Sequence, residues 1–399
     1  MNQLAHKNNA AQGKARLPLA LFSLTAGAFA IGMTEFVIMG ILPNVADDLN
    51  VSISQAGQLI TSYALGVAIG APILAIATHR LPQKQLLCLL MVLFIIGNGV
   101  AAIAPNYDIL MASRIFTSLA HGTFFGVGSV LAANLVSPNR RAAAVSMMMA
   151  GLTVANIVGV PLGTFIGQHL GWRASFGAVV IMGVITLVGI IALIPKIRQE
   201  QSSSIIRQVR ALAQPKLLLM LLTGAIGCSS LFTVFTYIAP LLMEVTGFAE
   251  HSVTWILVLF GFGVTFGNII GGKLADWKLM PTLIGGFGVL SLILALFAIV
   301  DEIPVAAVIT IFIWGIAAFV VLPGLQVRIM SLAKDAPALA STSNHSALNI
   351  GNAGGAFLGG YVITHAGLSF LPWVGSLLSL IGLILAYCVY RWDRHTLKA

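Results

Sequence analysis

Apolar stretches of about 20 residues recur along the chain, and they constrain its fold more than any other feature. A helix needs a run of about this length to cross the hydrocarbon core of a bilayer. Only 8% of the residues are charged, against roughly a quarter in an ordinary soluble domain. The apolarity is continuous, which favours helices over the alternating pattern of a membrane β-barrel. We therefore predict an all-α integral membrane protein.

The apolar stretches predict twelve transmembrane helices in two sets of six. We place them at 17–42, 54–77, 85–104, 109–135, 142–168, 174–195, 217–243, 253–275, 281–300, 304–327, 338–364 and 369–390. A basic, serine-containing segment separates the two sets and reads as a linker. The predicted organisation is an N-terminal tail (1–16), a six-helix bundle (17–195), a linker (196–216), a second six-helix bundle (217–390) and a C-terminal tail (391–399).

The net charge of +9 reports orientation in the membrane rather than a nucleic-acid partner. Every Lys and Arg except Arg114, inside a span, and Arg173 falls on one side of the predicted span map. Cytoplasmic loops carry such an excess of basic residues. We expect both termini in the cytoplasm, the chain as a monomer in a bacterial inner membrane, and lipid around it. The three cysteines lie far apart within spans, which predicts neither a disulfide nor a metal site.

One sequence offset relates the two halves of the chain. An offset of 197 residues connects three pairs: Pro43 and Pro240, His79 and Asp276, and Gly163 and Gly360. Six spans in each half give both halves the same orientation in the membrane. Parallel repeats of this kind bind substrate between the halves, near the middle of the membrane.

Five groups of small motifs occur in a fixed order. The loops after the second and eighth spans carry Ala75, His79, Arg80, Pro82, Gln83 and Lys84, and then Gly272, Asp276 and Trp277. The fifth span carries Ala155, Gly159, Pro161, Gly163 and Gly167, followed by Gly171, Trp172 and Arg173. The first and fourth spans carry Thr34, Glu35 and Phe36, and Ala120, His121 and Gly122.

The ordered set resembles the major facilitator superfamily, and within it the twelve-span drug:proton antiporters, closest to the sugar-efflux and chloramphenicol-exporter branch. Two departures stand out, because the loop after the second span is a weakened form of the family's motif and Pro161 stands one position later than usual. The resemblance implies two parallel six-helix repeats around a central cavity. It also implies a small organic substrate and protons as partners, with no cofactor.

The resemblance further implies ion pairs at cytoplasmic helix ends that latch one conformation. The residues concerned are Arg80, Arg140, Arg141, Gly272, Asp276 and Arg328. Simple anchoring by basic residues explains the arginines equally well. Asp276 is different, because an acid on the basic face has no such topological purpose.

Glu35 and Arg114 are the two charged residues well inside the predicted spans. Ionisable residues at such depth are costly and indicate function. At about 1.5 Å per residue, Glu35 lies about 10 Å and Arg114 about 9 Å below the same face, so the two can form an ion pair. A structural salt bridge is the alternative. Because Arg stays charged, Glu35 is the candidate proton site, and Arg114 and His121 are the other candidate proton-coupling residues.

A polar and aromatic face runs along the fourth span at intervals of three or four residues. It comprises Arg114, Ser118, His121, Phe125 and Ser129. Such a stripe must face protein or water. His121 is a candidate for proton shuttling, although a lone helical His is also commonly satisfied by a neighbouring hydroxyl or carbonyl.

The second half has no acid at comparable depth, since Phe232 and Ile311 occupy the positions offset by 197 from Glu35 and Arg114. Proton coupling is therefore expected in the first half alone. Aromatic residues of the seventh and tenth spans are candidates for the opposite wall of a binding cavity, and packing in the core or against lipid explains each of them as well. The candidate cavity residues are Thr34, Ser118, Phe125, Asn156, Phe232, Phe235, Tyr237, Trp314 and Asn349.

Small residues let helix backbones approach closely in a membrane. The candidate packing residues are Gly159, Pro161 and Gly163 in the fifth span, and Gly355 and Gly359 in the eleventh. The eleventh span is thin enough to slide against a neighbour. Static packing is an equal alternative.

The leading hypothesis is a proton-coupled antiporter that exports a sugar or drug-like solute by alternating access. A proton-coupled importer of the same fold is the second hypothesis. A membrane enzyme or receptor is remote, because the sequence contains no Cys-His, Ser-His-Asp or metal-ligand arrangement. We expect no enzyme activity.

Overall fold

The computed structural model describes residues 19–78, 81–137, 141–195, 214–333 and 337–396, and these residues form helices and turns without any strand. The helical elements are α2 (Ala20–Gly40), α3 (Leu42–Leu49), α4 (Ile53–Ala77), α5 (Gln83–Ala102), α6 (Tyr107–Asn134), α7 (Arg141–Val154), η2 (Ala155–Gly159), α8 (Val160–Leu170), α9 (Trp172–Leu193), α11 (Pro215–Phe235), α12 (Ile238–Pro240), η3 (Leu241–Val245), α13 (Glu250–Val300), α14 (Pro304–Leu332), α15 (Pro337–Ala366), η4 (Leu368–Phe370) and α16 (Leu371–Thr396). The prediction of an all-α fold is confirmed.

The long helices provide twelve membrane spans. Nine helical segments of the described chain are long and apolar enough to cross a membrane. One of them, α13, counts twice, because Lys278 leaves the helical conformation (φ −148°, ψ 88°) and divides it into two spans. That gives ten, and α4 with 25 residues and α15 with 30 are each long enough to complete twelve.

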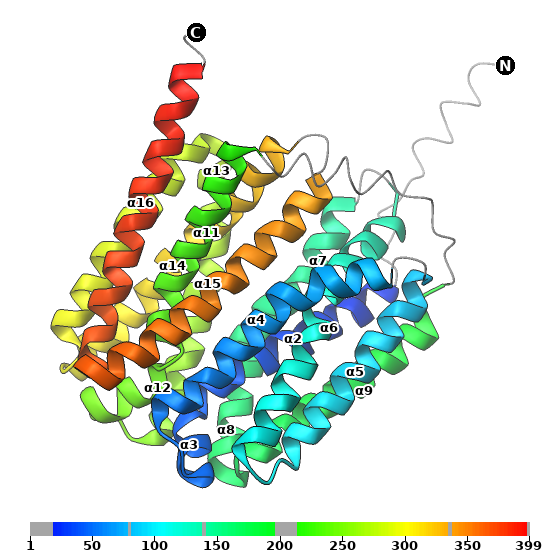
Figure 1. Ribbon diagram of the computed structural model, residues 1–399, viewed down its shortest axis with the longest axis horizontal. Helices are drawn as coiled ribbons and strands as arrows, with labels where there is room; N and C mark the ends of the chain where they lie inside the picture. The colour runs from blue at the N-terminus through cyan, green and yellow to red at the C-terminus, as the bar shows by residue number, and fades with distance from the viewer. Residues whose placement is uncertain (1–18, 79–80, 138–140, 196–213, 334–336, 397–399) are drawn as a thin grey trace, which may run out of the picture.

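The helices form two bundles side by side, the first from α2 to α9 and the second from α11 to α16 (Figure 1). The short helices α3 and α12 contact each other at one end of the molecule, which we call the distal end. They contain Pro43 and Pro240, the pair related by the offset of 197. The opposite end, where α16 ends, is called the terminal end.

The fifth span is interrupted by the π-helical turn η2, which separates α7 from α8. Pro161 stands in the first turn of α8 and has no backbone N–H to donate. The Asn156 side chain lies in this turn, and its Nδ2 donates to the Leu152 carbonyl at 3.0 Å. The proline of this span therefore produces a local rewinding of the helix rather than a break.

Two predicted boundaries differ from the structure. The predicted linker (196–216) lies outside the described residues except for residues 214–216, and Pro215 and Lys216 already belong to α11. The predicted tail (391–399) instead continues α16 as far as Thr396. The Asp393 carboxylate holds this extension, because it pairs with Lys216 of α11 and Arg328 of α14.

Glycines mark the closest helix approaches in both bundles. A Cβ added to Gly355 of α15 would lie 2.5 Å from the Ser229 carbonyl oxygen of α11, and one on Gly359 would lie 2.7 Å from that of Thr233. In the first bundle, a Cβ on Gly163 of α8 would lie 2.5 Å from Val37 of α2. The helices thus pack through backbone where a side chain would keep them apart.

Replacing Gly355 with Val is expected to destabilise the protein by about 1–3 kcal/mol, the usual cost of overpacking. The measurement is thermal unfolding of the purified protein in detergent. Gly354→Val is the matched control on the same helix, because a Cβ there meets only the Ser229 hydroxyl at 3.4 Å. Equal loss of stability in the two variants would contradict the packing role of Gly355.

Candidate functional site

Arg114 of α6 lies inside the first bundle with only 1% of its surface exposed. Its Nη1 donates to the carbonyl oxygen of Thr34 at 2.8 Å and to the Thr34 hydroxyl at 3.2 Å. The guanidinium carbon lies 4.1 Å from the centre of the Tyr63 ring, a cation–π contact with α4. Its Nε and Nη2 have no hydrogen-bond partner among the described residues.

Thr34 connects Arg114 to a third helix, α5. Its hydroxyl donates to Oδ1 of Asn98 in α5 at 2.6 Å, and Asn98 Nδ2 donates to the Phe94 carbonyl at 2.9 Å. Thr34 is fully buried. The structure therefore places this candidate cavity residue within a chain of polar contacts that joins α6, α2 and α5.

Glu35 faces away from this chain and towards the second bundle. Its carboxylate lies 3.9 Å from His121 Nε2, and Asn352 Nδ2 of α15 donates to Oε1 at 3.4 Å. Among the described residues no ion pair joins Glu35 to Arg114, although their depths allow one. The reason is helical geometry, because consecutive residues point about 100° apart, so Arg114 reaches Thr34 while its neighbour faces α15.

His121 sits between Glu35 and an aromatic pair. Its Nδ1 shares a hydrogen bond of 3.2 Å with the Tyr63 hydroxyl, and its ring lies 5.2 Å from that of Phe125. The Ser118 hydroxyl donates to the Ile115 carbonyl in its own helix. Arg114, His121 and Phe125 of the predicted stripe are thus buried within the first bundle, and Tyr63 joins them from α4.

The second bundle contributes neutral amides to the site from one face of α15. Asn352 contacts Glu35 directly, and Asn349 Nδ2 donates to the His345 carbonyl at 3.0 Å. The Oδ1 atoms of Asn344, Asn349 and Asn352 have no partner among the described residues. Sequence reasoning selected Asn349 but missed Asn352. The polar spacing 345, 349 and 352 in an apolar helix was the signal for the whole face.

The aromatic candidates of the second bundle form packed clusters. Phe235 stacks on Phe260 with centroids 4.5 Å apart, and Trp314 lies 5.1 Å from Phe260. Phe232 stacks on Phe36 of the first bundle, with centroids 6.1 Å apart. The four rings of the second bundle are almost completely buried and Phe36 is partly buried, so they make up core packing and a contact between the bundles beside Glu35.

A group of contacts joins the bundles at the distal end. Asn44 Nδ2 donates to the Glu250 carboxylate at 2.7 Å, and Gln168 Nε2 donates to the Glu250 carbonyl at 2.9 Å. The Ser54 hydroxyl of α4 donates to the Gly360 carbonyl of α15 at 2.9 Å. Tyr237 lies beside this contact, and its hydroxyl donates to the Ala356 carbonyl one turn earlier in α15.

Another distal contact lies within the first bundle. Arg173 Nη1 and the Trp172 indole donate to the Asp48 carboxylate at 2.6 and 3.0 Å. These two donors hold the pKa of Asp48 below its usual value. Arg173 also donates to the Ala104 carbonyl, so the one basic residue predicted on this side is used to fasten the distal loops.

The predicted latch residues that the structure describes lie at the terminal end. Arg80 and Arg140 fall outside the described residues, and Arg141 begins α7. Arg328 pairs with Asp393 inside the second bundle, which is a contact within one half rather than between halves. Gly272 and Asp276 lie near the end of the first span of α13, just before its kink.

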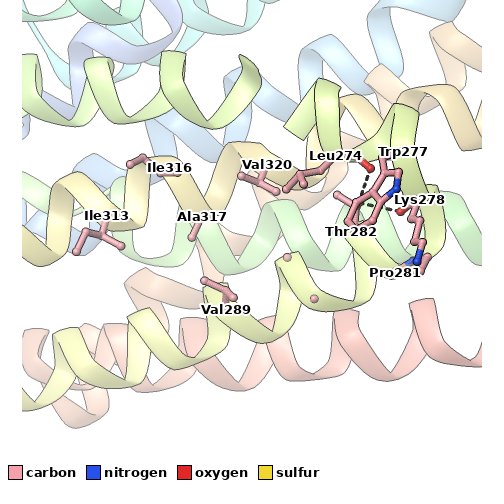
Figure 2. Close-up of a pocket in the computed structure, with 12 residues that line it drawn as sticks. Leu274, Trp277, Lys278, Pro281, Thr282, Val289, Ile313, Ile316, Ala317 and Val320 are labelled. Carbon is pink, nitrogen blue, oxygen red and sulfur yellow. Dashed lines mark hydrogen bonds between the residues drawn. The ribbon is translucent and has the colours of Figure 1, made fainter. Parts of the chain in front are cut away.

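A cavity of about 380 Å³ lies elsewhere, between the two spans of α13 and α14 (Figure 2). Its lining includes none of the candidate substrate or coupling residues. It is therefore distinct from the site around Glu35.

Two six-helix bundles with ionisable and amide side chains buried between them define a polytopic membrane protein of the transporter class. The family model described as Major Facilitator Superfamily matches residues 24–345. The chain belongs to that superfamily, a family of membrane transporters, and the predicted family is confirmed.

Similar proteins support the same assignment. The chain is 42% identical to the inner membrane transport protein YdhP of Escherichia coli (strain K12), over 94% of this chain and 97% of the relative. It is 30% identical to a chloramphenicol resistance protein of Streptomyces lividans, over 93% and 96%. The crystal structure of a bacterial homologue of the human lysosomal transporter Spinster, inward-facing and unoccupied, shares the fold with a TM-score of 0.77 at 15% identity, covering 93% of this chain and 96% of that one.

Thr34→Val is expected to destabilise the protein by about 1–3 kcal/mol, because it removes one acceptor of Arg114 and leaves buried Asn98 Oδ1 without its donor. Thermal unfolding in detergent measures the effect. Thr186→Val is the control, since that buried hydroxyl donates only within its own helix, to Met182. A Thr34 variant as stable as the Thr186 variant would show that the chain from Arg114 to Asn98 contributes nothing.

Proposed function

We propose that this protein is a proton-coupled antiporter that exports a small organic solute across a bacterial inner membrane. The observation that carries the proposal is the position of Glu35. It is a titratable group, 7% exposed, that belongs to the first bundle and accepts a hydrogen bond from Asn352 of the second. A proton bound there acts on the contact between the halves.

Protonation changes what Glu35 offers to its neighbours. The ionised carboxylate only accepts hydrogen bonds, whereas the protonated acid also donates one. Protonation also removes the negative charge of Glu35, which lies beside His121 and interacts electrostatically with Arg114. A carboxyl in this position converts proton binding into a different set of contacts between α2 and α15, which is the requirement for coupling.

The arrangement of the bundles supports an inward-facing state. The hydrogen bonds between halves through Asn44, Gln168 and Ser54 all lie at the distal end. With the basic loops and both termini in the cytoplasm, that end faces outwards and is closed. In the proposed cycle, Glu35 takes up a proton when the site faces out, which releases the solute, and loses it when the site faces in.

Export is the direction favoured by the relatives, because one of them is named for chloramphenicol resistance. Arg114 and the amides of α15 supply donors and acceptors suited to a polar, weakly charged solute. A thermal-shift screen of the purified protein against sugars, phenicols and cationic dyes identifies the class, because a ligand of the folded state stabilises it.

Glu35→Gln is expected to reduce uphill transport, driven by an imposed pH gradient in proteoliposomes, to the background level. Exchange of solute for solute should continue, since the amide keeps the shape and cannot take up a proton. Glu302→Gln, an exposed acid in the distal loop, is the control and should transport normally. Uphill transport by Glu35→Gln at the normal rate would sink the proposal. If the unmodified protein moved solute in the same direction as the protons, it would be an importer.

Glu250→Ala is expected to shift the protein towards the outward-facing state, because Asn44 loses its partner across the halves. Spin labels at positions 47 and 302, both exposed at the distal end, report this as a longer average distance in a variant without the three native cysteines. Asp108→Ala, which changes a distal acid that no ion pair holds among the described residues, is the control. An unchanged distance distribution in Glu250→Ala would argue against this contact as the outer closure.

A further inference from the structure

The second bundle carries a groove on its outer surface at the kink of α13 (Figure 2). Lys278 leaves the helical conformation there, and Pro281 has no N–H to rejoin the two spans. The Thr282 hydroxyl lies 2.8 Å from the carbonyl oxygens of both Leu274 and Lys278, which fixes the geometry of the turn. The groove is therefore a built feature of the fold.

Small residues give the groove its volume of about 380 Å³. A Cβ added to Gly285, on the second span of α13, would meet no atom within 4 Å. Aliphatic side chains form the walls, among them Val289, which is 50% exposed, and Ile313, which is 38% exposed. Exposed aliphatic residues within a span face hydrocarbon, so the groove suits an alkyl chain.

A cation stands at the polar end of this groove. The Lys278 ammonium makes no ion pair among the described residues and lies 4.7 Å from the centre of the Trp277 ring. Trp277 is 72% exposed, as expected of an aromatic residue at the level of the lipid head groups. Lys273 and Asp276 are the exposed charges close by in sequence, so the net charge at the mouth is positive.

An apolar groove with a cation at its head-group end matches one lipid class. We propose that the groove binds an acyl chain of an anionic phospholipid whose phosphate lies at Lys278. Basic pockets between transmembrane helices on the cytoplasmic side recognise anionic head groups in this way. A zwitterionic lipid brings a cationic group to the same mouth and is disfavoured. The site is independent of the transport cycle and of its direction.

The test uses the full-length protein in detergent with photoactivatable phosphatidylglycerol or phosphatidylcholine that carry the same reactive acyl chain. Labelled peptides are located by mass spectrometry. We expect phosphatidylglycerol to label residues 274–289 and 313–320 several-fold more than phosphatidylcholine. Lys278→Gln should reduce the labelling by phosphatidylglycerol to the level of phosphatidylcholine.

Gly285→Phe fills the groove and should abolish labelling there by both lipids. Gly177→Phe is its matched control, because a Cβ on that glycine of α9 also meets nothing within 4 Å. Equal labelling by the two lipids in the unmodified protein would overturn the proposal, as would labelling that Gly285→Phe leaves intact. If Gly285→Phe does not fold, Lys278→Gln decides, and an unchanged preference in that variant overturns the proposal too.

Discussion

A permanent charge inside a bilayer must be solvated by the protein itself, and Arg114 sets this requirement for the first bundle. The guanidinium stays protonated at any physiological pH, so α2 supplies a carbonyl oxygen and α4 supplies an aromatic face. The carbonyl belongs to Thr34, which is held in turn by Asn98. These contacts fix the rotation of α2 about its own axis. Since Glu35 follows Thr34 in the same helix, the contacts that solvate Arg114 also aim the carboxyl at the second bundle.

The two halves divide the work unequally. The first supplies Glu35, Arg114 and His121, and α15 of the second supplies neutral amides and His345, so no permanently charged residue on α15 opposes a change of charge at Glu35. The distal contacts between halves follow the same rule and use mainly amides and hydroxyls, such as Asn44, Gln168 and Ser54. A neutral hydrogen bond of this kind is worth only about 0.5–1.5 kcal/mol net, and the one from Asn44 to the Glu250 carboxylate is worth about 1.5–3 kcal/mol. Contacts so weak can be broken and remade, as the proposed alternating access requires.

The sequence was sufficient to locate the spans, the interruption after Asp276 and the two intramembrane charges, because apolar length and the cost of buried charge act locally along the chain. It was insufficient to predict which of these side chains contact one another. Matching depth brought Glu35 and Arg114 to one level, but a turn of about 100° between neighbouring residues decides which of them meet. The aromatic residues around Trp314 show the same limit, since periodicity identifies a buried face without saying whether rings or a cavity lie opposite. The extension of α16 depends on ion pairs to α11 and α14, which no local pattern encodes.

Close backbone packing within each half bears on the proposed rocking motion, in which each half moves as one body. Within the second bundle, Gly351 and Gly355 bring α15 against backbone carbonyls of α11, and Gly263 brings α13 against that of Phe312 in α14. Such approaches leave no room for sliding and favour each half as a rigid body. Between the halves, one approach of this type joins Gly261 to Asn156 in the π-helical turn η2, where an added Cβ would lie 2.6 Å from the Asn156 carbonyl oxygen. In a rocking motion the halves must move least where their backbones touch. The rewound turn that accommodates Pro161 therefore lies where a pivot between the halves is required.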